Sequence, residues 1–569
     1  MTAADAENGR GPAADGKAKR HSSVFQRNSP PPSAPKSLRC VMPQILSCTS
    51  AGFFSFSEGL SLSYSSSLIP QLQEKDSDIP ITLEQGVLLA SSMVVSMSIG
   101  TLLTGIIMNQ FGRLNTIRYC TLPFALGWFL VATATTYEQI LVGRVVTGLA
   151  NPLGINSAVV FTTEVAASHI RGALNAAHPT MASAGIVAMY VLGAVTDWRT
   201  AAWVCGASPV VLLVLLFLFC HESPIWLVSR GRHDEALRSL RAYARCNDTE
   251  DGREKLPERQ LEWLIQKRLF AESQAQNKMP WYHAILDLFR TPVGYKPLIM
   301  LTAVFVAQSF SGVYITLFYA APFFQEMGVK VDAFQAAIYI GLTRFTVGLV
   351  AVGLVRGVGI RKLMVGSSFG MAVCMVLSGY FTLYPEKGLD GWVAVGLVLV
   401  YVAFSCCGLL TVPWTMTAEL FPDQLRDVGQ SFSVFIADML MFAGLQLYPT
   451  LKNVLQHGEI TGAVGLQWFF ATVALLNVVF VIFFLPETHG KTLQEIEEHY
   501  QYNTMWLGRH KMPKMPGDAL GPAVPTLTAK LGPENSICYT LTAPATAADS
   551  RKSSGDSSVQ VSIVDTYRL

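Results

Sequence analysis

Two segments of the chain repeat one order of charged side chains, an acid followed seven residues later by an arginine. Glu164 closes one long apolar stretch and Arg171 opens the next, and Glu419 and Arg426 stand in the same places further along. Both acids fall at helix ends that favour cations, and both arginines at helix starts that favour anions. Ion pairs between helices are the simplest compensation. Because such pairs can form in one conformation and break in another, we take these four residues as a candidate gating network.

Other charged motifs also recur in the two parts of the chain. Arg113 follows Gly112, and Arg361 closes a weaker Gly-Ile-Arg counterpart. Glu222 and Glu487 stand in similar motifs after the last apolar stretch of each part. Recurrence at fixed places among apolar segments is typical of transporters built from two related halves. We therefore add these four residues to the network and expect solute transport.

The composition is that of a membrane protein. Apolar side chains make up 51% of the 569 residues and charged ones 14%, whereas soluble domains carry roughly a quarter charged residues. The net charge of +2 does not suggest a nucleic-acid partner. The ten cysteines show no disulfide or metal-ligand spacing, so we expect neither metal nor cofactor. No cleavable signal peptide is expected in the polar N-terminal segment.

Apolar stretches of about 20 residues can cross a membrane as helices, and the chain has two groups of six. We expect spans near 43–66, 85–108, 116–136, 140–163, 174–196, 200–220, 297–323, 334–356, 363–384, 391–416, 428–449 and 464–485. The predicted fold is an all-α membrane protein with twelve transmembrane helices in two six-helix halves. The expected parts are a disordered tail (1–40), the first half (41–220), a loop with short amphipathic helices (221–296), the second half (297–500) and a second disordered tail (501–569).

Lysine and arginine in the short loops predict the orientation. One side holds Arg113, Arg171, Arg361 and Arg426 and also the long basic loop 221–296. That side should be cytoplasmic, as should both termini, and we expect the plasma membrane. Within the loop, His233 to Tyr243 and Pro257 to Phe270 read as amphipathic helices, with the second presenting an apolar face.

The C-terminal sequence Tyr567-Arg568-Leu569 could offer a carboxylate to a PDZ-type groove, although a free tail is the better interpretation. The other expected partners are a small-molecule solute and membrane lipid.

Between residues 41 and 500 the chain resembles the sugar porter family of the major facilitator superfamily. The matching motifs are Asn109–Arg113, Gly143-Arg144, Glu164 with Arg171–Leu174, Glu222–Pro224, Gln308, Ser311-Gly312, Phe318-Tyr319, Pro413-Trp414, Glu419–Phe421, Arg426 and Pro486–Thr488. Within the family, Gly59–Ser66 and His178–Thr180 are most similar to the facilitated trehalose transporter group. The resemblance implies a central cavity and alternating access for a sugar-like solute. It also implies that Gln308 contacts substrate and that Tyr319 and Trp414 act as gates.

The resemblance is weaker where the family binds its sugar. Tyr314 stands where the family has an asparagine, Arg344 replaces another, and Asp438 falls at the position of a tryptophan. Amide side chains suit sugar hydroxyls because they both donate and accept hydrogen bonds. We expect Tyr314, Arg344 and Asp438 to take part in substrate binding, although Tyr314 could equally be a packing residue.

Three ionisable residues interrupt the apolar spans, namely Glu58, Arg344 and Asp438. Each costs roughly 2.5–3.5 kcal/mol near mid-membrane unless it faces water or a partner. We expect Arg344 and Asp438 to pair directly or through substrate, although Arg344 could instead snorkel or pack within the bundle. Glu58 lies three residues before Ser61, where proton-coupled relatives carry an aspartate, and is therefore a candidate proton site.

Three hypotheses follow. The first is a transporter of a small polar solute, a hexose, trehalose or polyol in the first place. The second keeps the fold but gives it an anionic or zwitterionic organic solute bound by Arg344. The third is a transporter-like sensor that binds without transport. No enzyme is expected, because no nucleophile, phosphate-loop or metal motif is present in the sequence.

Overall fold

The structure is a computed structural model, and it describes residues 38–74, 76–243, 256–275, 281–327, 332–384, 392–422, 425–457, 461–486, 500, 526–531 and 537–542. The chain divides into two compact units, residues 34–510 and a smaller unit of residues 1–33 with 511–569. Each is described by itself. The expected functional residues lie in the larger unit.

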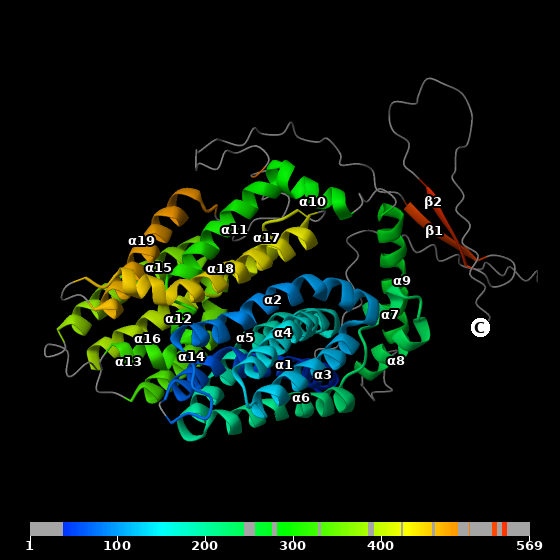
Figure 1. Cartoon of the computed structure of the whole chain (residues 1–569). Helices are drawn as coiled ribbons and strands as arrows, with labels where there is room; N and C mark the ends of the chain where they lie inside the picture. Colours follow the sequence, from blue (N-terminus) through cyan, green and yellow to red (C-terminus); the bar gives the residue numbers. More distant parts are fainter. Residues whose placement is uncertain are drawn as a thin grey trace, which may run out of the picture. The chain divides into compact units, whose positions relative to one another are not determined.

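The first half of the larger unit is a bundle of long helices (Figure 1). They are α1 (Leu38–Gln73), α2 (Leu83–Phe111), α3 (Arg113–Ala132), α4 (Tyr137–Val165), α5 (Ser168–Val195) and α6 (Trp198–Phe219). At one end of the bundle Thr82, Thr136 and Asp197 accept hydrogen bonds from the first turns of α2, α4 and α6. These caps satisfy backbone N–H groups that have no partner within the helix.

The second half has the same order, with two of its spans interrupted. Its helices are α11 (Pro292–Phe310), α12 (Ile315–Phe318), α13 (Ala320–Glu326), α14 (Ala333–Val358), α15 (Ile360–Leu383), α16 (Trp392–Cys407), α17 (Val412–Glu419), α18 (Arg426–Val454) and α19 (Gly462–Phe484). The predicted seventh span is divided among α11, α12 and α13, and the tenth between α16 and α17. The spans predicted from hydropathy run through both divisions.

The loop between the halves contains four short helices, α7 (Pro224–Ser229), α8 (His233–Tyr243), α9 (Leu256–Ala275) and α10 (Trp281–Arg290). Helices α8 and α9 confirm the two predicted amphipathic helices. Leu261, Leu264 and Ile265 on the predicted apolar face of α9 pack against Trp226 and Leu227 of α7. We call the end of the bundle beside α7 and α8 the loop end, and the opposite end the far end.

Ten helices among the described residues are long and apolar enough to cross a membrane. Each coincides with a predicted span, and α1 and α3 occupy the other two. Helix α1 is rich in serine, and many of these hydroxyls are bonded within the protein. Ser47 donates to the Phe219 carbonyl, and Ser55 bonds the His178 ring. Their partners let a polar helix lie inside an apolar bundle.

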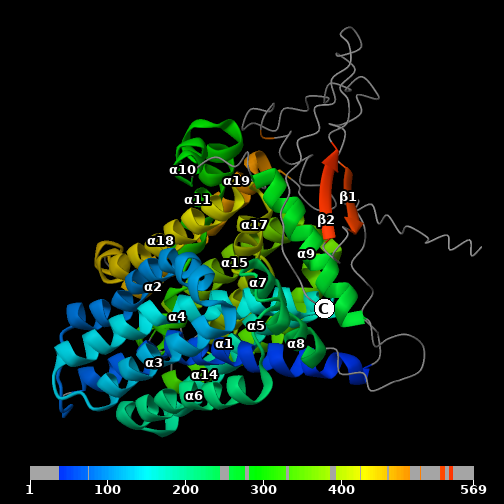
Figure 2. The ribbon, with the colours of Figure 1, turned by 90° about the vertical axis from the view of Figure 1, so that its right-hand side faces the viewer.

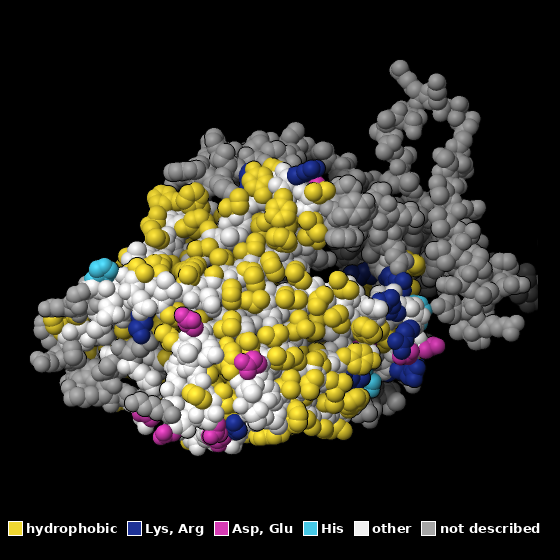
Figure 3. All heavy atoms as spheres, viewed as in Figure 1, with side chains coloured by type: hydrophobic (Ala, Val, Ile, Leu, Met, Phe, Trp, Pro, Cys, Tyr) yellow, Lys and Arg dark blue, Asp and Glu magenta, His cyan; other side chains and the backbone are white. Residues whose placement is uncertain are grey.

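The surface of the larger unit fits a lipid environment. Figure 3 shows hydrophobic side chains over the flank of α2, α3 and α4, and Lys and Arg gathered near α7 and α8. Ile106 of α2 and Leu122 of α3 are each 67% exposed. Large apolar side chains are stable in such positions when lipid covers them. The view in Figure 2 shows α7, α8 and α9 grouped beside the end of α1.

The smaller unit contains a two-stranded antiparallel sheet of β1 (Thr526–Leu531) and β2 (Ile537–Thr542). Thr526 lies opposite Thr542, and Leu531 opposite Ile537. This hairpin differs from the disorder predicted for the tail. The candidate PDZ ligand, Tyr567–Leu569, lies outside the described residues.

Candidate functional site

The loop-end charge cluster is built around the start of α3. This helix begins at Gly112, which offers no side chain as a cap and has a φ of 101°. The Glu222 carboxylate fills that role by accepting from the backbone N–H groups of Arg113, Leu114 and Asn115 at 3.0, 3.0 and 3.1 Å. A Cβ on residue 112 would lie 2.6 Å from Glu222 Oε2. Glycine at 112 therefore leaves the space that the Glu222 carboxylate needs to cap α3.

The Arg113 side chain joins a second acid to this cluster. Its Nη2 lies 2.9 Å from Glu164 Oε1, and its Nε donates to both oxygens of Glu164. Ser223 donates its hydroxyl to the same carboxylate. Helices α3, α4 and α7 are thus tied together within the first half. Charge-assisted, bidentate bonds of this kind are among the stronger polar contacts in proteins.

Pairing between Glu164 and Arg171 is not observed. The Arg171 Nη2 donates instead to the Ala166 carbonyl at 3.2 Å, in the turn before its own helix. The Arg361 guanidinium donates to the Ile482 carbonyl of α19. Glu419 and Arg426 end α17 and begin α18 as their spacing predicted. The Glu419 side chain and Glu487 lie outside the described residues, so their part in the network stays a prediction.

Three hydrogen bonds between the two halves lie toward the far end. Tyr190 of α5 donates to the Leu317 carbonyl at 2.7 Å, and the Ala321 N–H donates to Ser66 of α1 at 3.1 Å. Ser91 of α2 donates to Gln446 of α18 at 2.9 Å. Among the described side chains, none of the four ion pairs joins the halves. No sequence motif marks these contacts, because serine and tyrosine are common in apolar helices.

Gln308 sits where the seventh and tenth spans are interrupted. Its Nε2 donates to the carbonyls of Leu409 and Leu410, both at 2.9 Å, and its side chain is fully buried. Those carbonyls lie in the break between α16 and α17, where they lack helical partners. The substrate contact implied for Gln308 stays a prediction, but in this structure its amide nitrogen binds the protein backbone.

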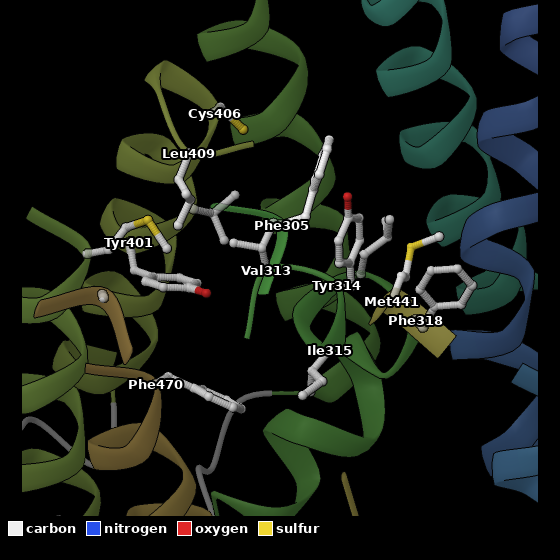
Figure 4. Close-up of a cluster of buried hydrophobic side chains, with 14 of the residues drawn as sticks. Phe305, Val313, Tyr314, Ile315, Phe318, Tyr401, Cys406, Leu409, Met441 and Phe470 are labelled. Atoms are coloured by element: carbon white, nitrogen blue, oxygen red, sulfur yellow. The ribbon is translucent and has the colours of Figure 1, made fainter. Parts of the chain in front are cut away.

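Tyr314 takes the remaining polar atom of Gln308. Its hydroxyl donates to Gln308 Oε1 at 3.1 Å, and Trp414 lies within hydrogen-bonding reach of that hydroxyl. The Trp414 ring also packs edge-on against Phe305, with centroids 5.4 Å apart. Figure 4 shows Phe305 and Tyr314 among the buried side chains around the unwound segment. Tyr314 and Trp414, both expected to meet substrate, are thus linked to each other.

Tyr319, the other predicted gate, stacks on Tyr448 of α18 with centroids 5.1 Å apart. Its side chain is 3% exposed, and its hydroxyl has no hydrogen-bond partner among the described residues. A buried hydroxyl without a partner is costly. A partner supplied by solute or by another conformation would remove that cost.

Arg344 is not paired with either intramembrane acid among the described residues. Asp438 is 3% exposed and lies within hydrogen-bonding reach of Thr101 on α2. Glu58 on α1 is half-buried and close enough to Asp438 for their charges to interact. Arg344 forms no ion pair with any described residue, so the direct Arg344–Asp438 pair is not present here. Binding of both through substrate stays a prediction.

Comparison with known proteins identifies this architecture. The model of the Sugar (and other) transporter family matches residues 48–500. The chain belongs to the Sugar (and other) transporter family. The prediction of a transporter rather than an enzyme is therefore confirmed, as are a multi-pass membrane protein and the resemblance to sugar porters.

Members of the family in insects are similar over most of this chain. A facilitated trehalose transporter Tret1 of Culex quinquefasciatus is 28% identical over 464 residues, which cover 81% of this chain and 86% of the relative. The Tret1 of Aedes aegypti is also 28% identical, but the chain spans 55% of its length. A solved structure of the major facilitator proton:xylose symporter XylE matches with a TM-score of 0.63 and 21% identity, covering 81% of this chain and all of that one. This likeness confirms the major facilitator fold.

Our first prediction concerns the carboxylate that caps α3. Glu222→Gln removes the charge that three N–H groups share and should destabilise the protein by about 1–3 kcal/mol, as expected for hydrogen bonds to charged groups. Thermal unfolding in detergent would measure the loss. Glu235→Gln is the matched control, because Glu235 forms an exposed pair with Arg232 at the start of α8. Equal melting temperatures for the two variants would contradict the capping role.

The second prediction tests the far-end contacts between the halves. Tyr190→Phe removes one bond across the seam and should favour opening of the far end by roughly two- to tenfold, the range for a typical hydrogen bond. The labelling rate of a cysteine placed at Ala321 would report that opening. Tyr64→Phe is the control, because Tyr64 donates to the Trp198 carbonyl within the first half. If both variants left the labelling rate unchanged, Tyr190 would only serve packing.

Proposed function

We propose that this protein carries a sugar or polyol across the membrane by alternating access. The arrangement that carries the proposal is the contrast between the two ends of the bundle. Three hydrogen bonds between the halves lie toward the far end, whereas the Arg113–Glu164 cluster at the loop end lies within one half. Such a structure can rock between two states about a central site.

The family and its members support a sugar as the solute. Relatives named facilitated trehalose transporters cover most of this chain, and the fold is that of a xylose symporter. We propose that Trp414 and Tyr319 move when solute binds, because both belong to interrupted spans. We also propose that solute competes with Tyr314 for Gln308, since that amide is the polar group buried at the breaks of both spans.

The orientation is part of the proposal. Arg113, Arg118 and Arg171 lie at the loop end of the first half. Basic residues in short loops favour the cytoplasmic side. We therefore propose that the loop end is cytoplasmic, that both termini are on that side, and that the protein works in the plasma membrane with its far end closed in this structure.

The third prediction tests transport itself. Purified protein in proteoliposomes should take up at least one labelled solute from a panel of hexose, trehalose, polyol and sugar acid. Trp414→Ala should weaken apparent affinity by roughly tenfold if the ring covers solute, with normal amounts of folded protein. Leu122→Ala, which changes a lipid-facing side chain, is the control. Binding of a panel member without uptake would instead favour a sensor.

The fourth prediction concerns proton coupling through Glu58. Glu58 and Asp438 come from opposite halves and are close enough to interact. If Glu58 exchanges a proton during transport, an inward proton gradient should stimulate uptake by the native protein and should not stimulate Glu58→Gln. Glu84→Gln is the control, because Glu84 is exposed in the first turn of α2. Uptake that does not change with the proton gradient, in the native protein or in either variant, would establish facilitated diffusion.

A further inference from the structure

Arg344 lies too far from either end of its helix for its guanidinium to reach the water at a membrane surface. It is the twelfth residue of α14, which spans Ala333–Val358. At 1.5 Å per residue, it lies about 16 Å from the start of the helix and about 21 Å from its end. A long side chain near a helix end can snorkel to the interface, but these distances exceed its reach. The guanidinium must therefore be accommodated inside the protein.

No described residue neutralises this guanidinium. Arg344 is 6% exposed, and its Nη1 is buried without a hydrogen-bond partner among the described residues. The four ion pairs in the described part of the chain use other arginines. The other deeply buried arginine, Arg144, is different, because it donates to the Ser61 carbonyl and to Ser65 at 3.0 and 2.8 Å. Arg344 is therefore a buried cation whose Nη1 group has no hydrogen-bond acceptor among the described residues.

Three tyrosine hydroxyls lie within electrostatic range of Arg344, from Tyr190, Tyr314 and Tyr401. All three donate their own protons elsewhere. Tyr190 donates to the Leu317 carbonyl, and Tyr401 donates to the Ser311 carbonyl at 2.6 Å. The N–H groups of Arg344 therefore lie near tyrosine hydroxyls whose own hydrogen bonds are already formed. The unwound part of the seventh span belongs to this region, and there Gly312 has a φ of 87°.

Neither acid of the membrane region forms an ion pair with Arg344 among the described residues. Asp438 and Glu58 interact with each other, and Asp438 reaches Thr101. Tyr314 is in electrostatic range of both Asp438 and Arg344. A buried cation that is not paired with these acids can bind an anionic group of a solute.

We propose that Arg344 binds the carboxylate of the solute, and that the carried solute is a sugar acid such as a hexuronate. This inference rests on the proposed transport of sugars and specifies the class of sugar. A guanidinium can hold a carboxylate through two parallel hydrogen bonds. The hydroxyls of the same solute would meet Tyr314 and Gln308 at the breaks of the two spans.

A carboxylate fits this region better than a phosphate. Phosphate monoesters carry nearly two negative charges at neutral pH, and Arg344 is one cation. Asp438 adds negative charge within range of Tyr314, and Glu58 adds more within range of Asp438. A singly charged carboxylate is therefore the anion that this charge distribution favours.

The experiment compares uptake of labelled glucuronate and glucose by the full-length native protein in proteoliposomes, with glucose 6-phosphate as a third solute. The native protein should prefer glucuronate to glucose by about tenfold or more, the factor expected for a charge-assisted hydrogen bond. Arg344→Gln should abolish that preference. Arg344→Lys keeps the charge but loses the two parallel bonds, and should retain only part of it.

The control variant is Arg199→Gln, which removes an arginine from a partly exposed pair with Asp78 at the far end and should leave the preference intact. If Arg344→Gln fails to fold, the native protein alone decides the question. Equal or better uptake of glucose, or a preference for the phosphate, would overturn the proposal.

Failure of this inference can be told apart from failure of the proposed function. Uptake of trehalose or glucose without glucuronate would leave sugar transport standing and remove the role of Arg344. Absence of uptake and binding for every solute in the panel would remove both. A preference for glucuronate that persists in folded Arg344→Gln protein would assign the acidic group to another part of the chain.

Discussion

A helix that is interrupted inside a membrane must have its freed backbone groups bonded by other parts of the protein, and this requirement governs the second half of the molecule. No water is available in hydrocarbon to satisfy N–H and C=O groups. Gln308 binds the carbonyls of Leu409 and Leu410, and Tyr401 binds that of Ser311. Each interrupted span is thus bonded by a residue of the other. Movement at one break will therefore change the hydrogen bonds of the other break.

The polar contacts within the first half differ from those between the two halves. Within the first half, Glu222 and the Arg113–Glu164 pair fix three helices at the loop end. Across the seam, the described polar contacts are single hydrogen bonds, and they lie beside apolar packing in which Ile69, Ala90 and Val94 join the core of the second half. Because a typical hydrogen bond contributes about 0.5–1.5 kcal/mol, these can be exchanged one by one, whereas each bundle stays intact. This difference in strength is what rigid-body motion between halves needs.

Most of the fold could be predicted from sequence because hydropathy over about 20 residues reports membrane spans directly. The helix ends at Gly112, Glu164 and Arg426 followed from charged motifs, and α8 and α9 from periodicity. Helices α7 and α10 were not predicted. Hydropathy does not mark the divisions at Ser311–Tyr314 and Gly408–Thr411, because their flanks are as apolar as any span. What marks them is long-range bonding, which hydropathy does not contain.

The site was harder to predict than the fold for a similar reason. The repeated motif predicted ion pairs between helices but not which residues pair, and Arg113 of a neighbouring helix is the partner of Glu164. Likewise opposite charge suggested a bond between Arg344 and Asp438, which the structure does not contain. In a bundle, residues distant in sequence compete for the same partner, and packing decides between them.

The substitutions at the expected sugar site act together. Tyr314 replaces an amide that the family uses, and its hydroxyl binds the carbonyl of Gln308, the amide that is retained. The nitrogen of Gln308 is already bonded to the backbone of the tenth span. A neutral sugar would therefore have to displace protein hydrogen bonds to gain its own, with little net gain. A solute with a negative charge can instead form an ion pair with Arg344, which has none among the described residues. The loss of amides and the presence of Arg344 can thus be understood as one change in what the protein recognises.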